Sequence, residues 1–320
     1  MSGGHRDARQ AAVLGRDTWQ VTMSEQNKAL VRKIYQATES GDTAILDAVV
    51  TDDVIEHPLN PGQPPGREAL KQIFGGFSVL VPDLCITVED VIAAGNRAAV
   101  RSTVTGTPAG PYLGVAPAGR PMRFEAIDIW RMEDGLVAEG WHVEDFVAAL
   151  VDWGAVTFAS RPRDVAPPPA ADAAMDAPAD PLRVVRRWYE ALRSADTGVL
   201  GTIFGDHFVN HGPIGAGVPM SSGRGGIGDD VMSLHRAFPD IDVIIADMFA
   251  EQDKVVTRVI ARGTHLGPLP HIPPTARRTT VMGHEIWRVA NGRILEHWGR
   301  FEDLDLLQQL GVLPAPSVSA

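Results

Sequence analysis

The sequence predicts an α+β protein with two tandem domains, each a curved antiparallel sheet with helices packed on its concave face. Three observations support this prediction: an internal repeat, helices followed by strands within each copy, and a two-residue turn signal before each last strand. Residues 28–154 align with residues 183–311 at an offset of 154, which becomes 157 after a three-residue insertion within 212–223. One unit of domain size therefore occurs twice.

Helices open each copy, because apolar residues recur there at every third or fourth position. Ser24 is the expected N-cap of the first helix, and Pro181 stands in the first turn of its counterpart. A later helix in each copy stops before a Pro-Asp pair, since proline disfavours helix for the residue that precedes it. The predicted helices cover residues 25–40, 43–50 and 67–80 in copy one and 181–194, 197–204 and 224–238 in copy two.

Strands with alternating polarity fill the second part of each copy, and one more short strand precedes the third helix. Asp134-Gly135 and Asn291-Gly292 separate the last two strands, and such pairs are a strong signal for a tight hairpin. The four strands predicted after the third helix cover residues 84–93, 97–107, 121–132 and 136–145 in copy one and 241–250, 254–265, 278–289 and 293–302 in copy two.

The composition excludes some classes of function. With 40 acidic against 29 basic residues, the formal net charge is −11, and the basic residues are scattered, so nucleic acid is not an expected partner. Cys85 is the only cysteine; it lies in an alternating apolar run and is expected to be a buried, inert thiol. No apolar run is long enough to cross a bilayer and no signal-peptide pattern is present, so a cytoplasmic protein is expected.

Composition also indicates the domain boundaries. Residues 1–22 have no counterpart before copy two and are predicted to form a disordered tail. Residues 159–180 are rich in Pro, Ala and Asp and are predicted to form a semi-extended linker. The two domains are then expected to span residues 23–158 and 181–316.

Several strings in copy two, read with the order of elements, carry a family resemblance: GTHLG, IPPTARR, HEIWRV, NGRILEHW and LLQQLG. The chain resembles the SnoaL-like polyketide cyclase or ester cyclase group of the nuclear transport factor 2-like superfamily, in tandem duplication. Copy one matches this pattern less completely, because it lacks the Gln-Leu pair near the end of the domain. The resemblance implies cone-shaped α+β barrels with a ligand cavity inside. It also implies that the two domains dock as an intramolecular pseudo-dimer, and a further homodimer is left open.

The resemblance further implies acid/base chemistry without a cofactor or a metal. In such cyclases an acidic or polar group near the end of the last strand removes a proton from an activated methylene, and the enolate attacks a carbonyl of the same molecule. Histidines and buried carboxyls suit this role, because their pKa values can lie near neutrality. The candidate catalytic residues are His211, His265, His284, Glu302 and Asp303 in copy two and His57, His142 and Asp145 in copy one.

Each candidate also has a structural interpretation. A loop histidine can bond to the backbone, and Asp145 or Asp303 can cap the last helix of its domain. The paired Trp residues can stack on a flat ligand or only pack, and the paired Arg residues can hold an oxyanion or only form salt bridges. The candidate substrate-binding residues are Trp130, Trp141, Arg101 and Glu125 in copy one and Trp287, Trp298 and Arg258 in copy two.

The leading hypothesis is a cofactor-independent cyclase that acts on a hydrophobic, polyketide-like small molecule in natural-product biosynthesis. Copy two lies nearer the family pattern and is the first choice for the active cavity. A hydratase or epoxide hydrolase is the second hypothesis, with Arg101, Asp128 and Asp145 as an incomplete water-activating set. A protein that only binds a small ligand is the third. The sequence lacks metal-ligand spacing, a phosphate loop and a nucleophile elbow, so no cofactor is expected.

Overall fold

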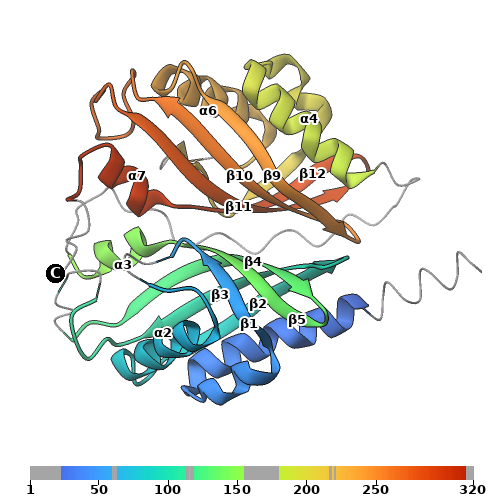
Figure 1. The fold of residues 1–320 in the computed structure, drawn as a ribbon. Helices are drawn as coiled ribbons and strands as arrows, with labels where there is room; N and C mark the ends of the chain where they lie inside the picture. The colour runs from blue at the N-terminus through green and yellow to red at the C-terminus, as the bar shows by residue number, and fades with distance from the viewer. Residues whose placement is uncertain are drawn as a thin grey trace, which may run out of the picture.

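The computed structural model describes residues 23–59, 63–112, 115, 119–154, 180–215, 218–219 and 221–314, and the statements below concern those residues. They form two tandem α+β domains, as the sequence predicts (Figure 1). The predicted tail and the predicted linker up to residue 179 lie outside the described residues. No described helix is both long and apolar enough to cross a membrane.

Each domain opens with helices and continues with strands. Domain 1 begins with a helix over residues 23–40. Its other elements are η1 (Thr43–Ala48), β1 (Val50–His57), α2 (Arg67–Leu80), β2 (Cys85–Ala94), β3 (Arg97–Gly106), β4 (Met122–Glu133), β5 (Leu136–Glu144) and α3 (Phe146–Asp152). The elements of domain 2 are α4 (Pro181–Ser194), η2 (Thr197–Val199), α5 (Leu200–Ile203), β6 (Phe204–Asn210), β7 (Pro213–Gly215), β8 (Val218–Pro219), α6 (Arg224–Ala237), β9 (Asp242–Glu251), β10 (Lys254–Thr264), β11 (Arg278–Ala290), β12 (Arg293–Phe301) and α7 (Asp303–Gln309).

Each domain contains one five-stranded sheet, ordered β1-β5-β4-β3-β2 in domain 1 and β6-β12-β11-β10-β9 in domain 2. The sheets are mixed and not purely antiparallel as predicted, because the first strand, β1 or β6, pairs parallel with the last, β5 or β12. A parallel pair needs a long connection, and the helix and the strands in between provide it. The first and last strands of each domain are thus neighbours.

Local sequence signals place most elements within one or two residues of their observed ends. Asp134 and Gly135 have φ values of 49° and 79°, and Asn291 and Gly292 have values of 51° and 70°. Positive φ at both central residues is what a type I′ hairpin turn requires. The two hairpins that join β4 to β5 and β11 to β12 were therefore predictable from four residues.

Two local predictions are wrong. Ser24 lies inside the first helix, and its hydroxyl donates to the Ala93 carbonyl of β2 at 3.0 Å instead of capping the helix. Cys85 is exposed. It follows the buried Leu84 at the start of the edge strand β2, and successive side chains of a strand point to opposite faces.

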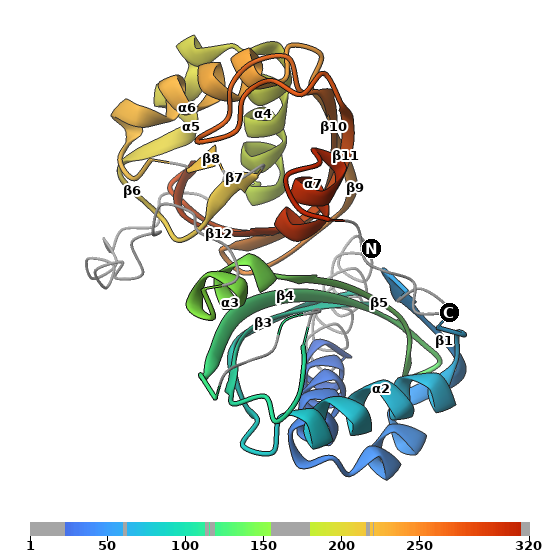
Figure 2. The same ribbon diagram turned by 90° about the vertical axis from the view of Figure 1, so that its left-hand side faces the viewer.

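Helix α2 and the first helix of domain 1, and α4 and α6 of domain 2, cover the concave face of their sheet on the side away from the other domain (Figures 1 and 2). The short helices α3 and α7 lie between the domains. The core of domain 2 joins Trp188 of α4, Phe204 of β6 and Trp287 of β11, which are all fully buried. Ile34 of the first helix and Trp130 of β4 belong to the corresponding core of domain 1. Because strand side chains alternate, the residues next to these tryptophans face the other domain.

The outer faces of the two sheets pack against each other (Figure 2). Ile127 and Ile129 of β4 and Ile286 of β11 are fully buried in one apolar cluster that spans both domains. At its margin Arg97 Nε forms an ion pair with Asp247 of domain 2 at 2.7 Å. The second face of each sheet is therefore an interdomain surface.

Substitution Ile129→Asp is expected to lower the free energy of unfolding by about 3–5 kcal/mol, because it leaves a charge without a partner in the interdomain cluster. Urea unfolding of the full chain measures this loss. Val79→Asp is the control, since Val79 is 77% exposed and its substitution should cost no more than about 0.5 kcal/mol. Equal losses at the two positions would contradict the interdomain packing.

Candidate active site

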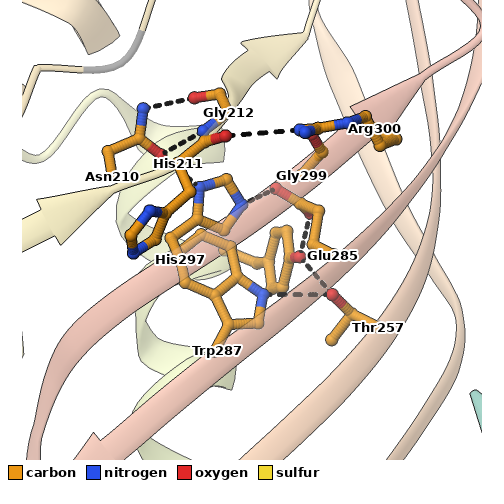
Figure 3. A network of polar contacts seen from close by, with 10 residues as sticks. Asn210, His211, Gly212, Thr257, Glu285, Trp287, His297, Gly299 and Arg300 are labelled. Atoms are coloured by element: carbon orange, nitrogen blue, oxygen red, sulfur yellow. Dashed lines mark hydrogen bonds and ion pairs between the residues drawn. The ribbon is translucent and has the colours of Figure 1, made fainter. Parts of the chain in front are cut away.

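A carboxylate on the central strand of each sheet is buried inside its domain and held by a tyrosine and a histidine. In domain 2 this carboxylate is Glu285 of β11. Its Oε2 accepts a hydrogen bond from the Tyr189 hydroxyl of α4, and its Oε1 lies 3.1 Å from Nε2 of His297 on β12. Helix α4, which is distant in the sequence, thus meets the adjacent strands β11 and β12 at one acid. Figure 3 shows Glu285 with His297.

A chain of hydrogen bonds fixes Tyr189, the member of this network that comes from helix α4. Thr257 Oγ1 of β10 accepts from Trp287 Nε1 at 3.1 Å and lies 2.7 Å from the Tyr189 hydroxyl. Because Tyr189 donates its own hydrogen to Glu285, Thr257 is the donor to Tyr189. Burial, together with the charge of Glu285, raises the pKa of Tyr189 well above its usual value, so the phenol keeps its hydrogen.

His297 is held from both sides. Its Nδ1 donates to Asn210 Oδ1 at 2.7 Å, an oxygen that also accepts from the Gly212 backbone N–H at 3.3 Å (Figure 3). The side chains of His297 and Glu285 are only 0% and 3% exposed. Both ring nitrogens and both carboxylate oxygens have partners, and the network of domain 2 is sealed from solvent.

Domain 1 builds the corresponding network around Asp128 of β4. Its Oδ2 accepts from the Tyr35 hydroxyl at 2.6 Å, and its Oδ1 accepts from His142 Nδ1 at 3.2 Å. Trp130 Nε1 donates directly to the Tyr35 hydroxyl at 3.2 Å. His142 Nε2 lies 3.1 Å from Oε1 of Glu56 on β1. Since both ring nitrogens of His142 face carboxylate oxygens, both donate and the ring is positively charged.

The His142 network differs from its counterpart in having a second carboxylate, Glu56, and in its access to solvent. Burial lowers the pKa of His142, but hydrogen bonds and charges from Asp128 and Glu56 outweigh burial and raise this pKa well above its usual value. The His142 side chain is 16% exposed, whereas that of His297 is completely covered. Solvent therefore reaches the network of domain 1.

The two histidines occupy different positions on equivalent strands. At the offset of 157, His142 aligns with Gly299, and Gly140 aligns with His297. Positions two apart on a strand share a face, so either histidine can reach the buried acid. In domain 1 a Cβ at Gly140 would lie 2.5 Å from the Trp130 ring, which excludes a larger side chain there. In domain 2 the ring of Trp287 lies differently and stacks on His297, with centroids 3.9 Å apart.

Glu144 is the group in domain 1 that is best placed to exchange a proton. It lies two residues after His142 and therefore on the same face of β5. Burial raises the pKa of Glu144 to about 7; the charge of His142 opposes this rise, and those of Asp128 and Glu56 add to it. Among the described residues nothing forms a hydrogen bond to its carboxylate. Domain 2 has Phe301 at this position.

Asp128, His142 and Glu144 could also be ligands of a metal ion, because one ligand atom from each lies within 4.8 Å of the others. Both ring nitrogens of His142 already bond to carboxylates, at 3.2 Å and 3.1 Å. A metal would have to replace one of these hydrogens and break its hydrogen bond. The arrangement is thus better suited to holding a proton.

Domain 2 encloses a cavity of about 40 Å³ between α4, α6 and the sheet. This volume exceeds the roughly 10–15 Å³ that one water needs, and it is far below the 300–1,000 Å³ of pockets for drug-sized ligands. Tyr189 and Glu285 lie in its wall, together with Trp188, Phe238 and Phe301. The cavity thus touches the sealed network.

Several sequence candidates lie on the interdomain surface and not inside a cone. His57 stacks on Trp141 at a centroid distance of 5.4 Å, and its Nε2 lies 3.0 Å from Oε1 of Glu139. Arg258 of domain 2 covers the same tryptophan, with its guanidinium carbon 4.4 Å from the ring centroid. Glu139 also holds Arg131 at 2.8 Å.

Domain 2 has the same arrangement of a histidine, a tryptophan and a glutamate, covered by an arginine of domain 1. His211 stacks on Trp298 with centroids 4.7 Å apart, and its Nε2 lies 3.2 Å from Oε2 of Glu296. Arg101 of domain 1 covers this tryptophan at 5.3 Å. Burial lowers the pKa of His211 despite Glu296. The residues that match between the copies therefore build a reciprocal contact, in which each domain gives a histidine–tryptophan pair and an arginine.

The remaining histidine and glutamate candidates also have structural partners. His284 faces domain 1, where its Nδ1 donates to the Ile127 carbonyl at 2.6 Å, and burial lowers its pKa to about 4. Glu125 forms an ion pair with Arg300 across the interface. His265 is buried in the loop after β10, and its Nδ1 accepts from the Thr275 backbone N–H at 3.3 Å.

The acids at the ends of the last strands differ from each other. Asp145 caps α3, because its side chain accepts from Ala148 N at 3.3 Å. Asp303 is already the first residue of α7, and the N-cap position belongs to Glu302. Burial raises the pKa of Glu302, whose Oε2 accepts from the Met282 backbone N–H at 3.1 Å.

The water-activating set of the hydratase hypothesis does not assemble. Asp128 is hydrogen-bonded inside domain 1, whereas Arg101 lies over Trp298 of the other domain and Asp145 caps a helix. The structure therefore favours no hydratase arrangement of these residues.

The sequence candidates omit most members of the two interior networks. The alternation of side chains along a strand could have indicated the two acids. Asp128 stands two residues before Trp130 and Glu285 two before Trp287, so each acid shares the face of a buried tryptophan. Their partners gave weaker signals. The omitted residues are Tyr35, Glu56 and Glu144 in domain 1 and Tyr189, Asn210, Thr257, Glu285 and His297 in domain 2.

The fold and the interior networks define a class of protein: a duplicated α+β domain with acid/base groups held inside it. The model of the family described as SnoaL-like polyketide cyclase matches residues 28–152 and again residues 182–310. These matches cover most of the chain, so the protein belongs to the SnoaL-like polyketide cyclase family. A search of curated proteins finds no significant match.

Solved structures are similar to parts of the chain. TsrD from Streptomyces laurentii is 29% identical over 41% of this chain and 97% of that chain, with a TM-score of 0.39. IdmH from Streptomyces antibioticus is 28% identical over 40% of this chain and 99% of that chain, with a TM-score of 0.36. A SnoaL-like polyketide cyclase from Agrobacterium tumefaciens is 21% identical over 37% of this chain and 91% of that chain, with a TM-score of 0.34.

Substitution Glu144→Gln is expected to stabilise the protein at pH 8 but not at pH 5. Burial raises the pKa of Glu144 to about 7 from 4.5, so the folded chain binds this proton more tightly than the unfolded chain does. Stability of the parent protein therefore falls as pH rises from 4.5 to 7, and the neutral amide avoids that fall. The expected gain is about 1–3 kcal/mol at pH 8.

Urea unfolding at both pH values measures this difference. Glu133→Gln is the matched control, because Glu133 also ends a strand but its side chain is 61% exposed. A Glu144→Gln protein that gains nothing at pH 8 relative to pH 5 would show that the carboxyl is not held protonated by burial.

Proposed function

We propose that this protein is a cofactor-independent cyclase for a hydrophobic, polyketide-like small molecule, and that domain 1 holds the reacting groups. The observation that carries the proposal is Glu144. Its carboxyl lies beside the imidazolium of His142, is free of hydrogen bonds from the described residues, and has a pKa of about 7. A general base works best when its pKa lies near the working pH.

The proposed reaction needs only proton transfer and one carbon–carbon bond. The Glu144 carboxylate removes a proton from a methylene flanked by two carbonyls, and the electron pair moves into an enolate. The enolate carbon attacks a second carbonyl carbon of the same molecule, and the new alkoxide takes the proton back from Glu144. The positive charge of His142 stabilises the enolate electrostatically.

The environment of Glu144 supports a substrate with a hydrophobic body. Tyr112 is half-buried near Glu144, and burial, together with the charge of this carboxyl, raises the pKa of the phenol. The Tyr112 ring packs against Phe146 and Trp153, with centroids 5.9 Å and 6.0 Å apart. An acid/base pair thus lies next to an aromatic surface.

Domain 2 supports the same role less well, although its sequence lies nearer the family pattern. The Glu285 carboxylate already accepts hydrogen bonds from Tyr189 and His297, and both acceptor oxygens are used. Phe301 replaces Glu144 at the end of the last strand. A carboxylate that is fully bonded and sealed is a poor base for an incoming carbon acid.

Turnover of nonane-2,4,8-trione tests the proposal, because its activated methylene can attack the distant ketone and close a six-membered ring. Ring formation is followed by chromatography, and exchange of the methylene hydrogens in D₂O by NMR. The rate constant kcat should rise with pH through about 7 and then level off, since the carboxylate of Glu144 is the base. Glu144→Gln should lower kcat about 100-fold or more.

Two variants separate the alternatives. Glu133→Gln should leave kcat unchanged, because this side chain is exposed and pairs with Arg131. Glu302→Gln tests the rival acid of domain 2. Loss of turnover in Glu302→Gln with full activity in Glu144→Gln would overturn the assignment to domain 1. Binding of the triketone to the parent protein without exchange or ring closure would contradict the proposed enzyme activity. It would favour a protein that only binds its ligand.

A further inference from the structure

We infer that the groove between helix α4 and the edge strand β9 of domain 2 is a binding site for a small phosphomonoester with an apolar body. The groove is lined by the exposed face of α4, whereas the cavity inside domain 2 is lined by its buried face. The two are therefore separate, and the inference does not rest on the proposed reaction at Glu144.

The groove is large enough for a small molecule. Its volume of about 440 Å³ lies within the range of roughly 300–1,000 Å³ that is usual for small-ligand pockets. One wall is α4 and the other is β9, which are neighbours (Figure 1). A β-bulge at Ala246 interrupts the pairing of β9 with β10 in this wall. The lining residues are Arg186, Glu190 and Arg193 of α4 and Ile245, Ala246, Asp247 and Met248 of β9.

Two guanidinium groups make this groove suitable for an anion. Arg186 and Arg193 stand two helical turns apart on α4 and therefore on the same face. Within the part of the chain that the structure describes, neither forms an ion pair. Of the two acids in the lining, Asp247 pairs with Arg97 of domain 1 at 2.7 Å, which leaves Glu190. Arginine binds phosphate through two parallel hydrogen bonds, and a phosphomonoester carries nearly two negative charges at pH 7.

The strand wall adds apolar surface to these charges. Ile245 and Met248 are half-buried and pack against the core of domain 2 with part of their surface. The groove thus combines guanidinium groups on the helix with apolar side chains on the strand. A phosphate ester of an apolar group can contact both walls, whereas inorganic phosphate can contact only the arginines.

Domain 1 fills the corresponding positions with acids. Glu39 aligns with Arg193, and its Oε1 accepts from the Ile86 backbone N–H of the edge strand β2 at 3.1 Å. This hydrogen bond joins the helix to the strand, and a guanidinium cannot form it because it has no acceptor. Glu89 aligns with Ala246 and stands at the equivalent bulge of β2. Domain 2 has therefore lost two carboxylates here and gained one positive charge.

Calorimetric titration of the full-length chain with phenyl phosphate tests the inference. The parent protein should bind phenyl phosphate about tenfold more tightly than phenol, benzoate or inorganic phosphate, because phenol lacks the charge, benzoate has only one, and phosphate lacks the ring. Glu144→Gln should bind phenyl phosphate as the parent does, so failure of the reaction in domain 1 remains distinguishable.

Three variants on α4 test the assigned contacts. Arg193→Glu introduces the domain 1 residue at this position and should weaken the binding of phenyl phosphate about tenfold or more. Glu190→Gln should strengthen it about threefold, because the remaining negative charge is removed. Arg183→Glu is the matched control: Arg183 is exposed on the same helix but does not line the groove, so the affinity should change less than about twofold.

Three results would overturn the inference: no binding of phenyl phosphate to the parent protein, binding of phenol or benzoate that is equally tight, or equal losses of affinity in Arg193→Glu and Arg183→Glu. The first two need no variant. The third would show that phenyl phosphate responds only to the total charge of the chain and not to this groove.

Discussion

The structure depends on one electrostatic constraint, which is a carboxylate buried on the central strand of each sheet. An uncompensated carboxylate in such a place is strongly unfavourable. Both domains compensate it with a tyrosine from the first helix and a histidine from the last strand, at Asp128 in one and at Glu285 in the other. The same contacts that satisfy the acid also fix the helix against the sheet, so the packing and the interior site are coupled.

The two copies meet this constraint in different ways. In domain 2, the Thr257 hydroxyl accepts a hydrogen bond from Trp287 and donates one to Tyr189, and the histidine is fully covered. In domain 1 the tryptophan bonds directly to the tyrosine, and the histidine lies between two carboxylates with access to solvent. One network is a sealed structural element with a cavity beside it. In the other, a histidine between two carboxylates lies next to Glu144, whose pKa burial raises to about 7.

Some of the residues that are identical in the two copies belong to the surface between them, among them His57, Arg101 and Trp141 with their counterparts. A contact with approximate two-fold symmetry uses the same side chains from both partners, as Arg101 over Trp298 and Arg258 over Trp141 show. Interior positions are not bound by this symmetry, because each network closes within its own domain. Identity between the copies therefore occurs both at the interface and in the cores, as at Tyr35 and Trp130, whereas Glu144 and Phe301 differ.

The sequence by itself determined the duplication, the order of the elements and most of their ends, because periodicity, proline and hairpin residues act locally. It also indicated which strand positions share a face with a buried tryptophan. Only the tertiary structure decided that β1 pairs with β5 and that Tyr35 and His142 meet at Asp128. It also decided that His57, Arg101 and Trp141, with their counterparts, turn outward. The reason is physical: a hydrogen bond or a pKa depends on neighbours in space, and here those neighbours come from separate elements of the chain.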